Sequence, residues 1–215
     1  MKIVIFGATG RTGALLVNQA LGAGHIVTAA ARRPGAITAM NPNLRKLNVD
    51  LYDAQAVNAA VAGHDCVLVA VAPASPLRPT TIFSTGIKNI LAGMKAGGVK
   101  RIVVLGSCGV DGETNTRWHM RLLAGLIVQP LLFHLYVDTG RMEGILEASD
   151  CDWTVVRPPR LTNGPAAGFY RVGLGCHLPH VASITRADVA TAMLELIEDP
   201  ASCRRWVEVA SSAWI

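Results

Sequence analysis

The chain has 215 residues, of which 51% are hydrophobic and 16% are charged, and its formal net charge is +5. This apolar content excludes an intrinsically disordered chain, and the length suits one domain around a single large core. The basic residues are scattered along the chain, which excludes a basic stripe for nucleic acid and favours a small anionic ligand.

The five cysteines are widely spaced, and the chain enters an apolar strand pattern at Lys2. We therefore expect a reduced, cytoplasmic protein without a targeting segment. The longest apolar tract, 122–137, is interrupted by Gln129, Pro130 and His134. It is shorter than the roughly 20 residues of a membrane span, so we expect a buried helix or the wall of a pocket.

Short β-rich runs alternate with longer helical patterns along the whole chain, which is typical of repeated βαβ units. We expect strands at 2–6, 25–31, 44–48, 66–71, 101–105, 153–156 and 206–209, and helices at 12–21, 54–61, 80–96, 136–148 and 187–198. This order predicts an α/β fold with a Rossmann-like, doubly wound parallel sheet in a single domain, 1–215. Substrate-pocket insertions are expected at about 108–137 and 158–184.

A glycine-rich loop follows the first strand directly and leads into the first helix. Its residues are Gly7, Ala8, Thr9, Gly10, Arg11, Thr12 and Gly13. Glycines in this context allow a tight turn and a close approach of the backbone to a pyrophosphate, and the helix N-terminus offers unpaired N–H groups. The loop therefore predicts a dinucleotide site, in which a side chain at Gly10 would obstruct the phosphates.

The end of the second predicted strand indicates which nicotinamide cofactor binds. An acidic residue there would bind the ribose hydroxyls of NAD, whereas arginine accommodates the 2′-phosphate of NADP. Here Arg32 and Arg33 stand in that place, and Arg11 adds a third cation, so we expect NADPH; the alternative is that Arg32 and Arg33 are solvated arginines at a strand end. Asp50, followed by Leu51, is placed to meet the adenine, and the alternative is that Asp50 caps a turn.

Beyond this loop, further segments carry a resemblance to a known family. They are 79–86 leading into Asn89, 98–103, Ser107, 141–143 and 152–159. With them the chain resembles the atypical short-chain dehydrogenases/reductases with an NAD(P)H-binding (NmrA-like) fold, in the branch of biliverdin-IXβ and flavin reductases. The resemblance covers nearly the whole chain.

The resemblance implies roles for residues at the ends of three strands. Val71, Ala72 and Pro73 would pass beside the cofactor, Ser107 would stand near the nicotinamide as a tentative catalytic hydrogen-bond donor, and the backbone of Pro158 and Pro159 would hold the carboxamide. An alternative for Ser107 is a purely structural role at the end of a strand.

Two positions depart from the family's patterns. The Tyr-x-x-x-Lys pair of ordinary short-chain dehydrogenases is missing, because Gly140 stands four places after Tyr136. A tyrosine general acid whose pKa is lowered by a neighbouring lysine is therefore not expected. Arg160 replaces the histidine that follows the double proline in biliverdin-type relatives; it is a tentative contact for an anionic substrate, or else a solvated loop cation.

These patterns favour an NADPH-dependent oxidoreductase that transfers hydride to a flavin, a quinone or a related conjugated small molecule. Such acceptors need no strong protein acid, because solvent can supply the proton. The alternative is a non-catalytic NADP(H)-sensing regulator of the NmrA type, and a cofactor-retaining isomerase ranks last. We expect a monomer or homodimer that binds neither nucleic acid nor membrane.

Other candidate groups favour structural roles. No metal site is expected, because Cys176, His177 and His180 lack a partner motif. Cys108 is expected to be packed and inert, and Asp138 and Glu143 to form ion pairs. The apolar segment 112–137 is either a lid over the acceptor or a subunit interface.

Overall fold

The computed structural model describes residues 1–73, 75, 77–108, 132–179 and 181–211. Its main sheet has the strand order β3-β2-β1-β4-β5-β6-β10-β8. The strands are β1 (Lys2–Phe6), β2 (Ile26–Ala31), β3 (Leu44–Asn48), β4 (Cys66–Val69), β5 (Arg101–Leu105), β6 (Asp152–Arg157), β8 (Tyr170–Leu174) and β10 (Arg205–Ser211). All pairs are parallel except β10 with β8, so the predicted Rossmann-like sheet is confirmed.

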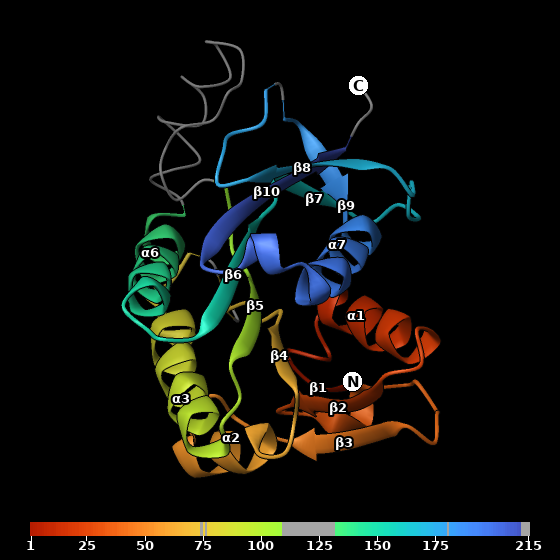
Figure 1. Cartoon of the computed structure of the whole chain (residues 1–215), viewed down its shortest axis with the longest axis vertical. Helices are drawn as coiled ribbons and strands as arrows, with labels where there is room; N and C mark the ends of the chain where they lie inside the picture. Colours follow the sequence, from red (N-terminus) through yellow and green to blue (C-terminus); the bar gives the residue numbers. More distant parts are fainter. Residues whose placement is uncertain (74, 76, 109–131, 180, 212–215) are drawn as a thin grey trace.

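Helices cover both faces of the sheet (Figure 1). On one face lie α1 (Arg11–Gly22) and α7 (Arg186–Glu198), and on the other lie α2 (Ala54–Val61), α3 (Ile82–Gly97) and α6 (Phe133–Glu147). The central strands carry continuous apolar runs because both of their faces are covered. Alternate residues of β1 accordingly belong to different clusters: Ile3 and Ile5 pack with α1 and α7, whereas Val4 and Phe6 pack with α2 and α3.

The predicted elements exist, with shifts of a few residues at their ends. The fourth strand ends at Val69 rather than at residue 71, α3 begins at Ile82 rather than at 80, and α6 begins at Phe133 rather than at 136. The α3 helix ends where Gly98 takes a left-handed conformation, φ +70°, that glycine adopts without strain.

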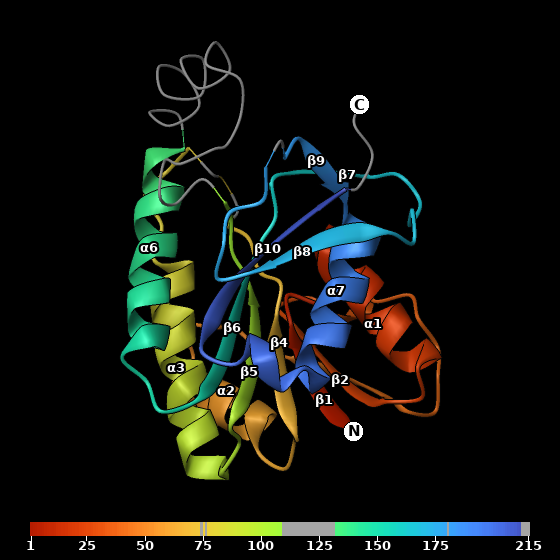
Figure 2. The same ribbon diagram turned by 45° about the horizontal axis from the view of Figure 1, so that its top comes forward.

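The segment after β6 contains strands that the sequence analysis missed. These are β8, which extends the main sheet, and β7 (Arg160–Thr162) and β9 (Ser183–Thr185), which form a separate parallel pair. Figure 2 shows this group around the N-terminal end of α7. Most of the predicted insertion 108–137 lies outside the described residues; its last part forms the beginning of α6.

The chain order creates one switch point in the sheet. From β1 the chain proceeds outward through β2 and β3, and then returns to the other side of β1 as β4. Ligands of open α/β sheets bind at the carboxyl ends of the strands where the order reverses in this way. The site is therefore expected above β1 and β4, where Gly7 and Ala70 follow the strands.

Candidate cofactor and active site

The glycine loop lies tightly against the end of β4. Gly7 has φ +82°, and a Cβ at this position would lie 2.7 Å from the carbonyl carbon of Ala70. A Cβ at Gly13 would lie 2.8 Å from the carbonyl carbon of Gly7. Real Cβ atoms do not approach backbone so closely, so Gly7 and Gly13 are required by the fold of the loop itself. Gly10 is more tolerant, because its Cβ would lie 3.1 Å from the Gly7 oxygen.

The N-terminus of α1 has no side-chain cap. Its N-cap residue is Gly10, and its first turn contains no acidic residue. By contrast, Asp53 caps α2, Thr185 caps α7, and the carboxylate of Asp138 accepts from Phe83 N and Ser84 N at the start of α3. The first-turn N–H groups of a helix need acceptors. Those of α1 are therefore available to an anion.

A cavity of about 1130 Å³ opens at this helix end, along the carboxyl edge of the sheet. It is large enough for a dinucleotide together with part of a small acceptor. Of the residues predicted to contact the cofactor, the following line it: Gly7, Thr9, Gly10, Arg11, Thr12, Arg32, Asp50, Leu51, Val71, Ala72 and Pro73. The cavity thus brings together the ends of β1, β2, β3 and β4.

The charge of the cavity wall is strongly positive. Its guanidinium groups belong to Arg11, Arg32, Arg78 and Arg186, and the only carboxylate among the described lining residues is that of Asp50. Asp50 Oδ1 accepts a hydrogen bond from Tyr52 N at 3.0 Å, so this carboxylate closes a turn as well as facing the cavity. Such a wall is suited to an anionic ligand.

The remaining predicted site residues lie outside the cavity lining. Gly13 is buried within α1, and Arg33 is exposed beside Arg32. Ser107 lies two residues beyond Leu105, which does line the cavity, and Pro158, Pro159 and the exposed Arg160 follow β6. The backbone joins these two segments, since Cys108 N donates to Pro158 O at 3.3 Å.

Tyr136 on α6 reaches the segment that follows β5. The side chain of Ser107 lies near its hydroxyl and acts to lower its pKa, but burial is the larger effect and raises this pKa above the ordinary value. The tyrosine therefore remains a neutral phenol. Burial also raises the pKa of the Cys108 thiol to about 11, so this thiol is protonated at neutral pH.

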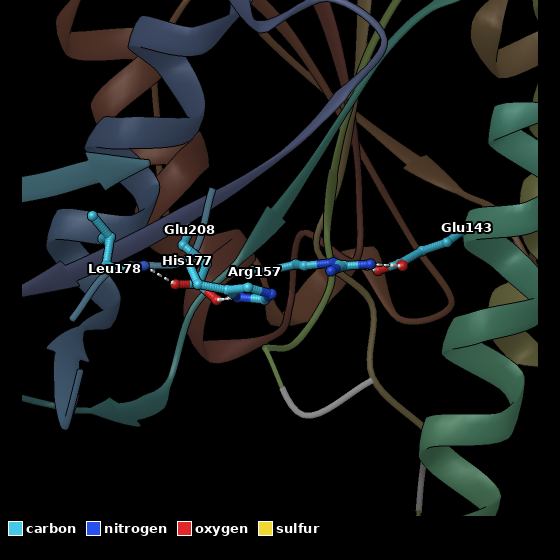
Figure 3. Close-up of polar contacts among 5 residues, drawn as sticks. All are labelled: Glu143, Arg157, His177, Leu178 and Glu208. Carbon is cyan, nitrogen blue, oxygen red and sulfur yellow. Dashed lines mark hydrogen bonds and ion pairs between the residues drawn. The ribbon is translucent and has the colours of Figure 1, made fainter. Parts of the chain in front are cut away.

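Buried ion pairs support this edge of the sheet (Figure 3). Arg157, the last residue of β6, binds the carboxylate of Glu143 on α6 through two nitrogens, and its guanidinium lies 4.8 Å from the ring centre of Trp206. The pair ties α6 to the strand that leads into Pro158. The structural role expected for Glu143 is thus observed, while Asp138 caps α3 and has no ion-pair partner among the described residues.

His177 also has a structural partner. Its Nδ1 lies 2.7 Å from Glu208 Oε1, and the other oxygen of Glu208 accepts from Leu178 N (Figure 3). Within the described ranges, no three His, Cys, Asp or Glu side chains gather as ligands for a metal; His180 lies outside those ranges. None of the helices in the described part of the chain has the length and apolar character needed to cross a bilayer.

Several lining residues were missed by sequence reasoning. They are Arg78 and Tyr52 from loops, Arg186 from the start of α7 and Leu161 from β7, and none of these segments carries a local phosphate-binding pattern. Position in the fold, rather than a motif, brings them to the cavity. The contact between Tyr136 and Ser107 was missed for the same reason, because nearly thirty residues separate them in sequence.

Comparisons with known proteins agree with this geometry. The sequence model of a family described as NAD(P)H-binding matches residues 7–200. An uncharacterised chloroplastic protein of Arabidopsis thaliana is 27% identical over 226 aligned positions, covering 99% of this chain and 77% of that protein.

Two solved structures show the same fold at lower identity. A short-chain dehydrogenase/reductase of Veillonella parvula in complex with NADP is 16% identical to this chain. The alignment covers 99% of this chain and 95% of that chain, with a TM-score of 0.81. ChuY, an anaerobillin reductase of Escherichia coli O157:H7, is 21% identical to this chain. The alignment covers 100% of this chain and 99% of ChuY, with a TM-score of 0.76. With the family match spanning most of its length, the chain belongs to the NAD(P)H-binding family.

Proposed function

We propose that the protein is an NADPH-dependent reductase that transfers hydride to a flavin, a quinone or a related conjugated acceptor. The observation that carries the proposal is the positively charged cavity at the switch point of the sheet, with the uncapped N-terminus of α1 in its wall. The folds of an NADP complex and of an anaerobillin reductase support the same class of reaction.

The phosphates of the cofactor would lie against the backbone of Gly10, Arg11 and Thr12. Arg32 stands at the end of β2, where a carboxylate would repel a 2′-phosphate, and this favours NADPH over NADH. Asp50 and Leu51 would border the adenine, and Val71, Ala72 and Pro73 the ribose on the nicotinamide side. A bound NADPH supplies the hydride from C4 of its nicotinamide to the acceptor, and solvent supplies the accompanying proton.

The chain's own groups would orient the reactants and exclude water. Ser107, held by Tyr136, would donate a hydrogen bond to the carboxamide or to charge developing on the acceptor. The backbone after β6, at Pro158 and Pro159, would hold the carboxamide, and the Glu143–Arg157 pair fixes that strand against α6. Because the Tyr136 phenol is neutral, it would keep Ser107 in place without carrying charge into the site.

Stopped-flow oxidation of NADPH tests the proposal, with FMN, FAD and a panel of quinones as acceptors. We expect turnover with at least one acceptor, preference for NADPH over NADH, and loss of both binding and turnover in Gly10→Val. NADPH binding without oxidation by any acceptor would contradict the reductase and indicate a dinucleotide-sensing regulator.

A further inference from the structure

Two guanidinium groups of the cavity wall come from different elements and share no counter-charge. Arg11 opens α1 and Arg186 opens α7, and these helices pack side by side (Figure 1). Neither arginine forms an ion pair with a carboxylate in the described part of the chain. Burial, together with the positive charge of Arg11, lowers the pKa of Arg186. Like charges held together this way favour the binding of an anion between them.

Arg186 is held in place from the segment after β6. Its guanidinium donates to the Asn163 side-chain oxygen at 2.7 Å and to Leu161 O at 3.3 Å, and both Leu161 and Arg186 line the cavity. These two bonds use the Nη1 atom, which leaves other N–H groups of the fork for a ligand. The side chain is therefore positioned before any ligand arrives.

The position of Arg186 separates it from Arg32, the side chain expected to bind the 2′-phosphate of the cofactor. Arg32 follows β2, whereas Arg186 opens α7, which contacts β5, and the cavity residue Leu105 is the last residue of β5. The order β2-β1-β4-β5 puts three strand spacings between the ends of β2 and β5, which at about 4.8 Å each is about 14 Å. The pyrophosphate already has the backbone N–H groups of α1. Because α7 contacts β5, an anion at Arg186 would lie toward the β5 side of the cavity, where Ser107 is expected beside the nicotinamide and the acceptor.

We propose that Arg186, assisted by Arg11, binds a phosphate or carboxylate group of the acceptor, so that the preferred acceptors are anionic conjugated molecules. The exposed Arg160, for which the sequence suggested this role, lies outside the cavity lining, and Arg186 replaces it. The inference rests on the proposed reductase function, because it names the class of acceptor for the same cavity.

The test compares FMN with riboflavin, which has the same ring system and no phosphate. Quenching of flavin fluorescence is titrated with protein that is saturated with NADP⁺, for the wild type, Arg186→Met and Arg186→Lys. Arg205→Met removes the same charge from an exposed position of β10 and is the matched control. Thermal unfolding checks that each variant is folded, and a separate titration gives its NADPH affinity.

A charge-assisted hydrogen bond corresponds to a change of about tenfold or more in affinity. We expect the wild type and Arg205→Met to bind FMN at least about tenfold more tightly than riboflavin, and Arg186→Met to lose this difference while its NADPH affinity changes by less than about twofold. Arg186→Lys should keep part of the preference, because it keeps the charge and loses the fork.

Three results would overturn the inference: equal or absent binding of FMN and riboflavin by the wild type, an equal loss for both flavins in Arg186→Met, or a tenfold loss of NADPH affinity in that variant. The last result would assign Arg186 to the phosphates of the cofactor. If FMN binds with the expected preference while no acceptor is reduced, the reductase proposal fails and the anion site stands.

Discussion

Substitution of single glycines by alanine tests whether the glycine loop is built by backbone contact. At Gly13 the new Cβ would lie 2.8 Å from the carbonyl carbon of Gly7 and 3.1 Å from the Cα of Ala8. Ordinary carbon–carbon contacts begin at about 3.5 Å, so the loop and the start of α1 must separate by at least about 0.7 Å, and the carbonyl oxygen of Gly7 lies closer still. Because both contacts are with backbone, no side chain can rotate away.

Overpacking of this size costs about 1–3 kcal/mol of folding free energy. The displacement also moves the N–H groups of α1 away from the loop. If one charge-assisted hydrogen bond to a phosphate is lost, NADPH affinity falls about tenfold or more. Gly10→Ala should cost less folding free energy, because its Cβ would only approach the Gly7 oxygen to 3.1 Å.

The matched control is Gly144→Ala on α6, where a Cβ meets nothing within 4 Å. Alanine is a better helix former there, so the control should unfold at the same or a higher temperature. Thermal unfolding and calorimetric titration with NADPH on all three variants check the order Gly144, Gly10, Gly13. A Gly13→Ala protein that unfolds and binds NADPH like the wild type would refute the close approach of loop and helix.

Three further predictions concern side chains that are wholly or partly buried. Asp138→Ala removes the carboxylate that accepts hydrogen bonds from Phe83 N, Ser84 N and the Ser84 hydroxyl. The free energy of unfolding measured in urea should therefore fall by about 3 kcal/mol, and that of Asp138→Asn should lie between the values of the wild type and Asp138→Ala. An unchanged unfolding midpoint for Asp138→Ala would contradict this. Burial raises the pKa of Cys108 to about 11 and that of Cys66 to about 12 from an ordinary 9.0. Above pH 9 the thiols of the unfolded chain lose their protons while both thiols of the folded protein keep theirs. The contribution of these thiols to the free energy of unfolding is therefore complete below pH 9 and is lost as pH rises toward 11–12. The free energy of unfolding measured from pH 8 to 11 should fall less in Cys66→Ala than in the wild type. Iodoacetamide at pH 8 should modify the exposed Cys176 before Cys108. Fast labelling of Cys108 would contradict its raised pKa.

The sequence predicted those parts of the fold that depend on local patterns. The strands β1, β3 and β5 have the predicted bounds. Continuous apolar runs define the buried parallel strands β1 and β5, whereas β3 is an edge strand that alternates only weakly. The strands β7, β8 and β9 were missed because their residues alternate weakly and include Arg160, Tyr170 and Ser183, so only pairing with distant strands stabilises them.

The same difference separates the predicted from the missed site residues. The glycine loop is a local motif, and the structure places Gly7, Gly10 and Thr12 in the cavity wall as a motif requires. Arg186 reaches that wall only because α7 packs on α1 and because β7 and the residue after it supply hydrogen-bond acceptors for its guanidinium. Such contacts between remote segments leave no pattern in one sequence.

Titration of the purified protein with NADPH and with NADH, for the wild type and for Arg32→Asp, tests the cofactor site most directly. The wild type should bind NADPH more tightly than NADH, and Arg32→Asp should reverse this preference, because the new carboxylate repels the 2′-phosphate and accepts hydrogen bonds from the ribose hydroxyls. If neither dinucleotide binds the wild type, the cavity above β1 and β4 is not a dinucleotide site.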